Sequence, residues 1–124
     1  MKLIYENESF ALRGAFFEVY KTLGCGFLEA VYQEALSKEF EICKIPFLEQ
    51  VELKLQYKGV PMKQTYKPDF LCYGKIIVEI KAASAIAPEH DAQLINYMRI
   101  TGMKLGFLVN FGHYPKLELK RFVL

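Results

Sequence analysis

Residues 67–81 read KPDFLCYGKIIVEIK, and their pattern predicts two adjacent strands of one sheet. Apolar segments at 70–73 and 76–80 lie on either side of Gly74, a residue that suits a tight hairpin turn. The segment at 76–80 is apolar on both faces of the strand, so we expect it to be buried at the centre of the sheet. The sequence therefore predicts a hairpin whose second strand is central.

The length of the turn decides which side chains share a face of this hairpin. A three-residue turn at 73–75 pairs Cys72 with Ile76 and places Asp69 opposite Glu79, whereas a two-residue turn points Asp69 to the other side of the sheet. Gly74 favours the three-residue turn, although a β-bulge is compatible with the alternative. We therefore expect Asp69 and Glu79 on one face, about 5 Å apart across the strands.

The flanking sequence predicts two helices before this hairpin and a helical crossover after it. Apolar residues recur at helical spacing from Ser9, expected as the N-cap, to Leu23, and again from Phe27 to about Cys43. Pro88 suits the first turn of a helix over residues 89–101, which Gly102 ends. Further strands are predicted at 51–57, 60–66, 105–109 and 117–124.

These elements favour an α/β (α+β) fold in the order α-α-β-β-β-α-β-β. Strands divided by a helical crossover indicate a mixed central β-sheet flanked by helices. The 124 residues suffice for one domain with its own core, so we expect a single domain over residues 1–124. Apolar residues make up 52% and charged residues 24% of the chain, which excludes a disordered protein.

The net charge, the hydrophobic segments and the cysteine spacing indicate which partners and which cellular compartment to expect. The net charge of +2 is too mild to indicate a nucleic-acid partner by itself. No apolar run approaches the roughly 20 residues that cross a bilayer, and the N-terminal MKLIYENESF becomes acidic and polar too early for a signal peptide. Cys25, Cys43 and Cys72 lack the spacing of a zinc or disulfide framework. We therefore expect a cytoplasmic protein with reduced thiols and no membrane partner.

Two carboxylates and a lysine in the quoted segment carry the chemical prediction. Glu79 and Lys81 alternate onto one face of their strand, about 7 Å apart. An ionised Glu79 within an apolar strand is costly unless a cation or hydrogen-bond donors meet it. Asp69 and Glu79 together can hold Mg²⁺ or Mn²⁺, which polarises a phosphate and lowers the pKa of a bound water. Lys81 can orient that water or neutralise developing charge.

The spacing of these residues also resembles a known family. Pro68-Asp69 and Glu79-Ile80-Lys81 are similar to the PD…ExK motif of the PD-(D/E)XK nuclease superfamily. Residues 26–32, GFLEAVY, match the pattern GxxExxY, and residues 93–97, QLINY, match QxxxY. Together, and in this order, these motifs resemble those of the small GxxExxY proteins of bacteria and archaea, over nearly the whole chain.

The resemblance implies a fold, an activity and a set of site residues. It implies a restriction-endonuclease-like core, αβββαβ, preceded by one extra helix. It also implies that Asp69 and Glu79 bind the metal with Lys81 acting beside them, that Glu29 is an accessory metal ligand or orienting group, and that Gln93 supports the site. On this basis the chain is expected to be a Mg²⁺-dependent nuclease acting on DNA or RNA.

Each of these residues also has a structural explanation. Glu29 falls in the first turn of a predicted helix, where a carboxylate favours the helix dipole by roughly 0.3–1 kcal/mol. Tyr32 is expected in the core. Asp69 follows a proline and could be a turn acid, but we expect it inside an apolar strand, which favours the site role. Gln93 and Tyr97 lie one turn apart and can hydrogen-bond to the sheet. His90 is either solvated or a substrate contact.

Two other functions remain open at this level. One is a catalytically inactive nuclease-like module that binds nucleic acid or another protein, which the short chain suggests. The other is a purely structural domain in which Glu79 and Lys81 form a buried ion pair. The apolar residues Phe10, Phe17, Phe47 and Phe122 suggest a homodimer if they are exposed.

Overall fold

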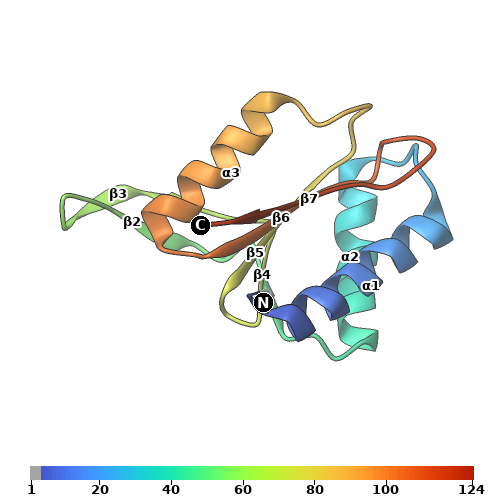
Figure 1. Cartoon of the computed structure of the whole chain (residues 1–124), viewed down its shortest axis with the longest axis horizontal. Helices are drawn as coiled ribbons and strands as arrows, with labels where there is room; N and C mark the ends of the chain where they lie inside the picture. The colour runs from blue at the N-terminus through green and yellow to red at the C-terminus, as the bar shows by residue number, and fades with distance from the viewer. Residues whose placement is uncertain (1–3) are drawn as a thin grey trace.

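The computed structural model describes residues 4–124. The expectation that the N-terminus is not a signal peptide concerns in part residues 1–3, which lie outside the described residues. The helices are α1 (Glu6–Leu23), α2 (Glu29–Ile42) and α3 (Pro88–Thr101), and none of the helices in the described part is long and apolar enough to cross a membrane. The strands are β1 (Phe47–Glu49), β2 (Leu53–Tyr57), β3 (Val60–Tyr66), β4 (Phe70–Cys72), β5 (Ile76–Lys81), β6 (Leu105–Asn110) and β7 (Glu118–Val123) (Figure 1).

Five of the strands form one mixed sheet in the order β1-β4-β5-β6-β7. Strands β5 and β6 run parallel, and α3 is the crossover between them, whereas the other neighbouring pairs are antiparallel. The predicted fold class, a mixed sheet flanked by helices, is confirmed. Strand β5 is central, as its apolar character on both faces indicated.

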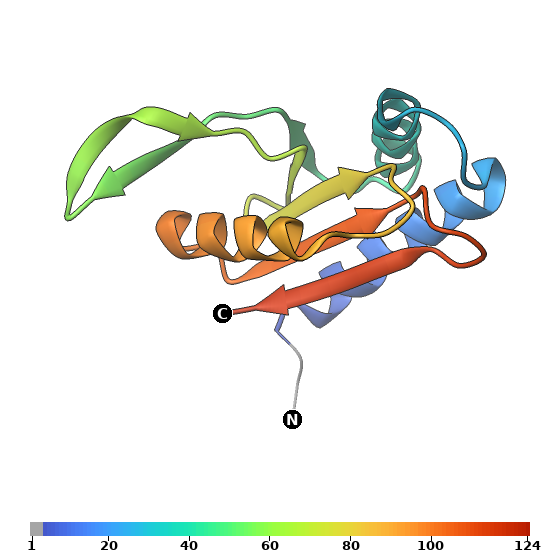
Figure 2. The same ribbon diagram turned by 90° about the horizontal axis from the view of Figure 1, so that it is seen from above.

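The structure contains five strands before α3, whereas the expected order has three and the segments predicted at 51–57, 60–66, 70–73 and 76–80 make four. The short strand β1 adds to the edge of the sheet beside β4, and strands β2 and β3 form a separate two-stranded sheet. Figure 2 shows this β2–β3 hairpin standing away from the main sheet.

The two faces of the sheet are covered by different helices. One core cluster joins α1 and α2 to Ile76, Val78 and Ile80 of β5. A second cluster joins α3 and the β2–β3 hairpin to Ile77 of β5. Because side chains alternate along a strand, Glu79 and Lys81 lie on the side of α3. The layer between the sheet, α3 and the hairpin is therefore where the predicted chemistry falls.

The first helix begins three residues before the predicted N-cap. The Ser9 backbone N–H donates to the Tyr5 carbonyl within the first turn of α1, so Ser9 lies inside the helix and is buried. Tyr5 occupies the cap in a left-handed conformation, and the acidic Glu6 and Glu8 in the first turn complement the helix dipole. The prediction that Ser9 caps this helix is wrong, because its N–H already has a helical partner.

The turn between β4 and β5 has the predicted three-residue length. Cys72 pairs with Ile76 and Leu71 with Ile77, so continuing the register places Asp69 opposite Glu79. Leu71 and Ile77 pack in the same α3-side cluster. This is the arrangement that a shared face for Asp69 and Glu79 requires, since each lies two residues from one of these apolar side chains.

Two glycines permit close packing beside β5: Gly106 lies opposite Ile77 near its start, and Gly112 lies against the segment that follows Lys81. A Cβ atom on Gly106 would lie 2.8 Å from Met98 Sδ, so the glycine lets α3 pack closely on β6. A Cβ atom on Gly112 would lie 2.5 Å from the backbone nitrogen of Ala83, which follows β5. The buried Asn110 joins the same backbone segments, because its side chain donates to the Ala83 carbonyl and accepts from the Ala83 N–H. These contacts fix the chain as it leaves Lys81.

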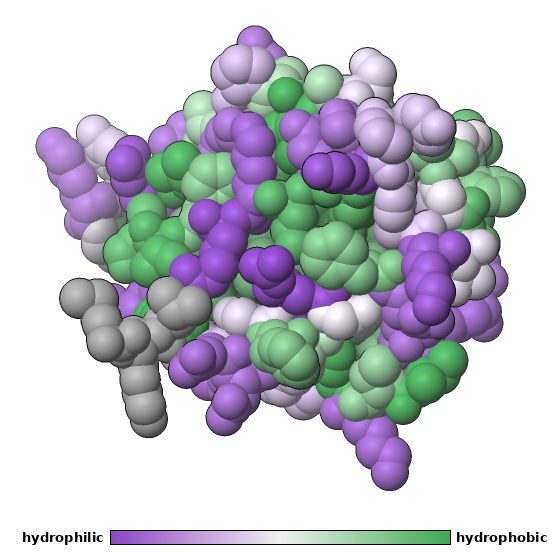
Figure 3. All heavy atoms as spheres, turned by 45° about the vertical axis from the view of Figure 1, so that its right-hand side comes forward, coloured by the Kyte–Doolittle hydropathy of each residue, from purple (hydrophilic) through white to green (hydrophobic). Residues whose placement is uncertain are grey.

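Two of the four phenylalanines that suggested a homodimer are exposed at the surface. Phe10 is 82% exposed and Phe17 is 46% exposed, both on α1, whereas Phe47 and Phe122 are partly buried against the two cores. On the face drawn in Figure 3, hydrophobic and hydrophilic side chains are interleaved. The homodimer stays a prediction.

Candidate active site

A cavity of about 270 Å³ lies between the hairpin, β5 and α3. Three of the five predicted site residues line it: Glu79 and Lys81 from β5, and Gln93 from α3. The remaining lining residues come from the hairpin, α3 and β6, and are Thr65, Tyr66, Lys67, His90, Leu94, Tyr97 and Leu108. Glu79, Lys81 and Gln93 are therefore accessible from the cavity.

Glu79 is held in place by two hydrogen-bond donors. The Tyr66 hydroxyl donates to Glu79 Oε1 over 2.8 Å, and the Asp69 backbone N–H donates to the same oxygen over 2.9 Å. Burial, followed by the negative charge of Asp69, raises the pKa of Glu79 to about 7, although both hydrogen bonds favour the ionised form. Glu79 is therefore a half-buried carboxyl group whose ionisation lacks a sufficient positive counter-charge.

Asp69 lies at a bend immediately before β4, so it is not inside the strand as its apolar neighbours suggested. Its Oδ2 accepts a hydrogen bond of 2.8 Å from the Ile80 backbone N–H, and Gln50 donates to Oδ1 over 3.4 Å. Burial is the largest effect on its pKa, which is raised even though the Ile80 N–H and Lys81 act to lower it. Asp69 and Glu79 thus exchange hydrogen bonds with each other's backbone segments and lie side by side.

Lys81 is the last residue of β5 and lines the cavity beside Glu79. Among the residues that the structure describes, the ion pairs are Lys67–Glu52, Lys75–Glu8 and Lys120–Asp91, and Lys81 takes part in none. A purely structural Glu79–Lys81 ion pair is therefore not formed. The ammonium group of Lys81 is available to a ligand in the cavity.

Glu29 is the first residue of α2 and does not line the cavity, but its charge is close to the site. Partial burial raises its pKa first, and the negative charge of Asp69 raises it further, whereas Lys81 and His90 lower it. The adjacent turn of α2 also contacts Asp69, because Gln33 donates to the Asp69 carbonyl over 3.4 Å. The N-terminal end of α2 therefore lies close to Asp69 and within reach of the charges of Lys81 and His90.

Helix α3 contributes one predicted residue and two whose roles the sequence left open. Gln93 and Tyr97 both line the cavity, and the Tyr97 ring stacks on Tyr66 with a centroid distance of 3.9 Å. His90 lines the cavity too, and its Nδ1 accepts a hydrogen bond from the Ala87 N–H. A neutral His90 therefore carries its proton on Nε2.

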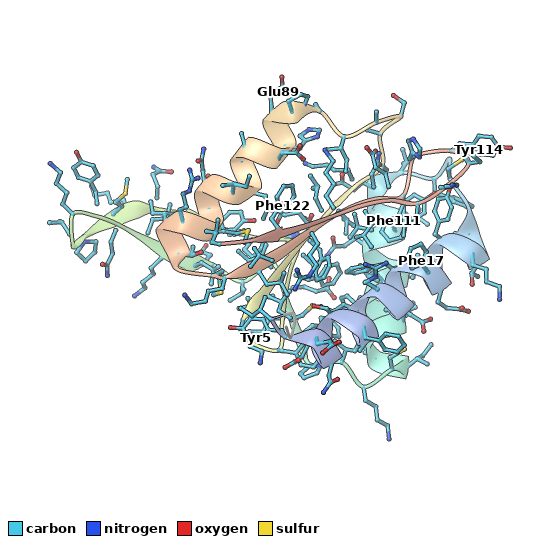
Figure 4. The ribbon with its side chains drawn as sticks, viewed as in Figure 1. Tyr5, Phe17, Glu89, Phe111, Tyr114 and Phe122 are labelled. Carbon is cyan, nitrogen blue, oxygen red and sulfur yellow. The ribbon has the colours of Figure 1, made fainter. Side chains whose placement is uncertain are left out.

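Tyr66 is the site residue that the sequence analysis missed. It reads as the last residue of a strand, and no short motif marks it. The available signal was its place just before Lys67-Pro68-Asp69, which brings its hydroxyl into reach of Glu79. The opposite case is Tyr32 of the GxxExxY pattern, which is fully buried as expected: its hydroxyl bonds the Gly24 carbonyl, and its ring stacks on Phe111, labelled in Figure 4.

The donor set of the site fits a hard divalent cation. Two carboxyl groups with raised pKa values lie side by side, and burial is the main cause in both, so positive charge is what the pair lacks. Within residues 4–124, no three His, Cys, Asp or Glu side chains form a complete ligand cluster. Asp69 and Glu79 would hold such a cation, with Glu29 nearby, and water would supply the remaining ligands.

The fold and the site define an α/β protein with two carboxyl groups and a lysine at the C-terminal end of its central strand. The family model of the PD-(D/E)XK nuclease superfamily matches residues 6–122, and the chain belongs to this superfamily. The crystal structure of SSO0001 is similar, with a TM-score of 0.49 and 17% sequence identity over 93% of this chain and 76% of that chain. No curated protein matches the chain.

Proposed function

We propose that this chain is a GxxExxY-type member of the superfamily that hydrolyses phosphodiester bonds in nucleic acid with Mg²⁺ or Mn²⁺. The observation that carries the proposal is the pair of half-buried carboxyl groups of Asp69 and Glu79, with Lys81 beside Glu79 at the cavity and in no ion pair among the described residues. Membership in the nuclease superfamily supports it.

Each group of the chain has a role that follows from its chemistry. Asp69 and Glu79 would hold the cation, which when bound polarises the phosphate and lowers the pKa of a water molecule. Lys81 places a positive charge where the phosphate oxygens gain negative charge in the transition state. Gln93 offers an amide to orient water or phosphate from α3.

Tyr66 and Glu29 act on the acidic pair rather than on the substrate. The Tyr66 hydroxyl fixes the orientation of the Glu79 carboxylate, as an outer-shell partner does for a metal ligand. Glu29 adds negative charge near Asp69 from the end of α2 and is either an accessory ligand or an orienting group. The structural explanation of Glu29, a favourable helix-dipole interaction, is compatible with both roles.

The test is cleavage of single- and double-stranded DNA and RNA by the purified chain with Mg²⁺ or Mn²⁺. Asp69→Ala and Lys81→Ala are each expected to lower the rate by about 10²-fold or more, because each removes charge stabilisation of the transition state. Lys116→Ala, an exposed lysine between β6 and β7, is the matched control and should cleave normally. Equal cleavage by all the variants would attribute the activity to a contaminant and refute the proposal.

An inactive module that binds nucleic acid or protein is the second candidate. It is favoured by the hydrogen bonds that already satisfy Glu79 Oε1 and Asp69 Oδ2 from within the chain. This candidate predicts that nucleic acid binds in a salt-dependent manner. It also predicts that calorimetry detects no Mn²⁺ binding that depends on Glu79. The enzyme predicts Mn²⁺ heat that Glu79→Gln removes.

A further inference from the structure

The positive charge of the chain is concentrated in the β2–β3 hairpin and the residues that join it to the body. Residues 51–67, here called the arm, contain four lysines and one acidic residue, for a net charge of +3. The other 107 residues contain 12 basic and 13 acidic side chains, for a net charge of −1. The overall charge of +2 is therefore the sum of a basic arm and a slightly acidic remainder of the chain.

The two faces of the arm differ in character. One face contributes Leu55 and Tyr66 to the cluster that packs on α3. Lys54 lies directly opposite Thr65, and Lys63 lies two residues before Thr65 on β3, where the register of the hairpin shifts. Lys54 and Lys63 are both exposed. The solvent-facing side of the hairpin thus presents two lysines beside Thr65.

This basic face leads directly into the candidate active site. Thr65 and Lys67 line the cavity together with Glu79 and Lys81. We define Lys54, Lys63, Thr65 and Lys67 as the lysine track. Lys67 pairs with Glu52 over 3.4 Å, but both side chains are more than half exposed, so the pair is weak and exchangeable for a phosphate. Thr65 and Lys67 thus connect the exposed lysines of the hairpin with the cavity that Glu79 lines.

From this arrangement we propose that the lysine track binds the phosphate backbone of a nucleic-acid duplex and delivers the scissile phosphate to the cavity. The inference rests on the proposed function and names its substrate class. From Lys63 to Lys67 the chain extends about 13 Å, the length of about four nucleotides along one strand of a duplex. The track can therefore follow about a third of a helical turn of backbone.

A duplex fits the track better than a single strand does. Proteins that bind single strands combine basic grooves with aromatic side chains on which the bases stack. The aromatic rings near the track already have partners, because Tyr66 stacks on Tyr97 and Lys58 Nζ lies 5.5 Å from the ring centroid of the exposed Tyr57 at the hairpin tip. The track offers hydrogen bonds and positive charge to phosphates but no free aromatic surface to unpaired bases. It therefore suits a duplex, in which the bases are already paired and stacked.

The binding test uses the full chain in EDTA, so that no cleavage occurs, with DNA and RNA duplexes of about 20 base pairs and the matching single strands. The slope of log affinity against log salt concentration reports the phosphates contacted. The double variant Lys54→Gln/Lys63→Gln is expected to bind duplex at least several-fold more weakly and to reduce the magnitude of the slope by about 2. Lys67 and Lys81 are left unchanged, because they line the cavity.

The matched control is Lys21→Gln/Lys38→Gln, which removes two exposed lysines from α1 and α2, away from the arm (Figure 1). It should bind duplex as the unchanged chain does. Equal weakening by both double variants would show a response to net charge alone and overturn the proposal. Absence of duplex binding, or tighter single-strand binding that depends on Lys54 and Lys63, would also overturn it.

Cleavage measured in Mg²⁺ separates this proposal from the proposed function. The arm variant is expected to raise KM and leave kcat unchanged, because its lysines bind the duplex away from the reacting phosphate. Cleavage that is unaffected by the arm variant overturns the lysine track and leaves the nuclease assignment intact. Binding that depends on the arm without any cleavage supports the track and refutes the nuclease.

Discussion

Glu79 is a carboxyl group in a central strand, where burial would ordinarily select a hydrophobic side chain. The chain retains it with two hydrogen bonds, yet the pKa of Glu79 remains raised to about 7 because burial and Asp69 outweigh both donors. A residue that is costly for the fold and lies at a cavity is better explained by chemistry than by packing.

The raised pKa of Glu79 gives the metal-free chain a defined pH dependence. Its folded pKa of about 7 exceeds the ordinary value of 4.5, so its contribution to stability is present below about pH 4.5 and is lost as the pH rises to about 7. Glu79→Gln removes this loss and keeps an oxygen acceptor for Tyr66. We expect the variant to gain up to about 3 kcal/mol relative to the unchanged chain between about pH 4.5 and pH 8.

Urea unfolding in EDTA across this pH range measures the effect. Glu41→Gln, which alters an exposed carboxylate at the end of α2, is the control and should follow the unchanged chain. Parallel stability curves for Glu79→Gln and the unchanged chain would contradict the prediction.

Tyr66 tests whether the orientation of Glu79 matters. Tyr66→Phe removes the hydroxyl donor to Glu79 and keeps the ring that stacks on Tyr97. Loss of an outer-shell partner is expected to weaken Mn²⁺ binding by about 10-fold or more, with little change in stability because the stacking is retained. Calorimetric Mn²⁺ titration measures it, and Tyr57→Phe at the exposed hairpin tip is the control. Unchanged Mn²⁺ affinity in Tyr66→Phe would show that the hydroxyl serves only the fold.

At the scale of elements, the site depends on how the chain leaves β5 and how α2 begins. Gly112 and Asn110 hold the β6–β7 connection against the segment after Lys81. Tyr32 holds the α1–α2 connection, since its hydroxyl bonds the Gly24 carbonyl and accepts from the Phe27 N–H. The tyrosine of the GxxExxY pattern thus positions the start of the helix that carries Glu29, rather than touching the cavity.

Gly112 has a direct test by addition of one methyl group. Gly112→Ala places a Cβ atom within 2.6 Å of the Ala82–Ala83 backbone, so we expect a loss of about 1–3 kcal/mol of stability from overpacking. Gly14→Ala in α1 is the matched control, because a Cβ atom there meets nothing within 4 Å. It should stabilise the chain by roughly 0.5–1 kcal/mol. Thermal unfolding measures both, and equal effects would contradict the close approach.

Tyr32→Phe separates a structural tyrosine from a catalytic one. The variant leaves the half-buried Gly24 carbonyl without its donor and is expected to cost about 1–2 kcal/mol of stability. The folded fraction should keep its kcat, because Tyr32 does not line the cavity. A large loss of kcat at unchanged stability would place Tyr32 in the chemistry instead.

At the scale of the whole molecule, local patterns predicted the fold class well. The glycine in the Tyr73–Lys75 turn fixed the hairpin length, and the apolar character of β5 placed it at the centre of the sheet. The separate β2–β3 sheet was not predictable in the same way, because its position depends on packing against α3 rather than on its own alternation. The start of α1 was misplaced because a buried serine resembles an N-cap in sequence.

The candidate site was predictable where a motif marked it and not elsewhere. Asp69, Glu79 and Lys81 follow from spacing along a hairpin. Tyr66 and His90 belong to the site because the hairpin, β5 and α3 pack together and form the cavity. These elements are distant in sequence, so no local sequence pattern predicts the contact.

The most direct measurement of the central claim is calorimetric titration of Mn²⁺ into the purified chain at neutral pH. The account predicts binding that Asp69→Asn and Glu79→Gln each weaken by at least about 10-fold, whereas Lys116→Ala binds normally. Absence of binding at saturating Mn²⁺, or equal binding by all the variants, would contradict the claim that Asp69 and Glu79 form a metal site.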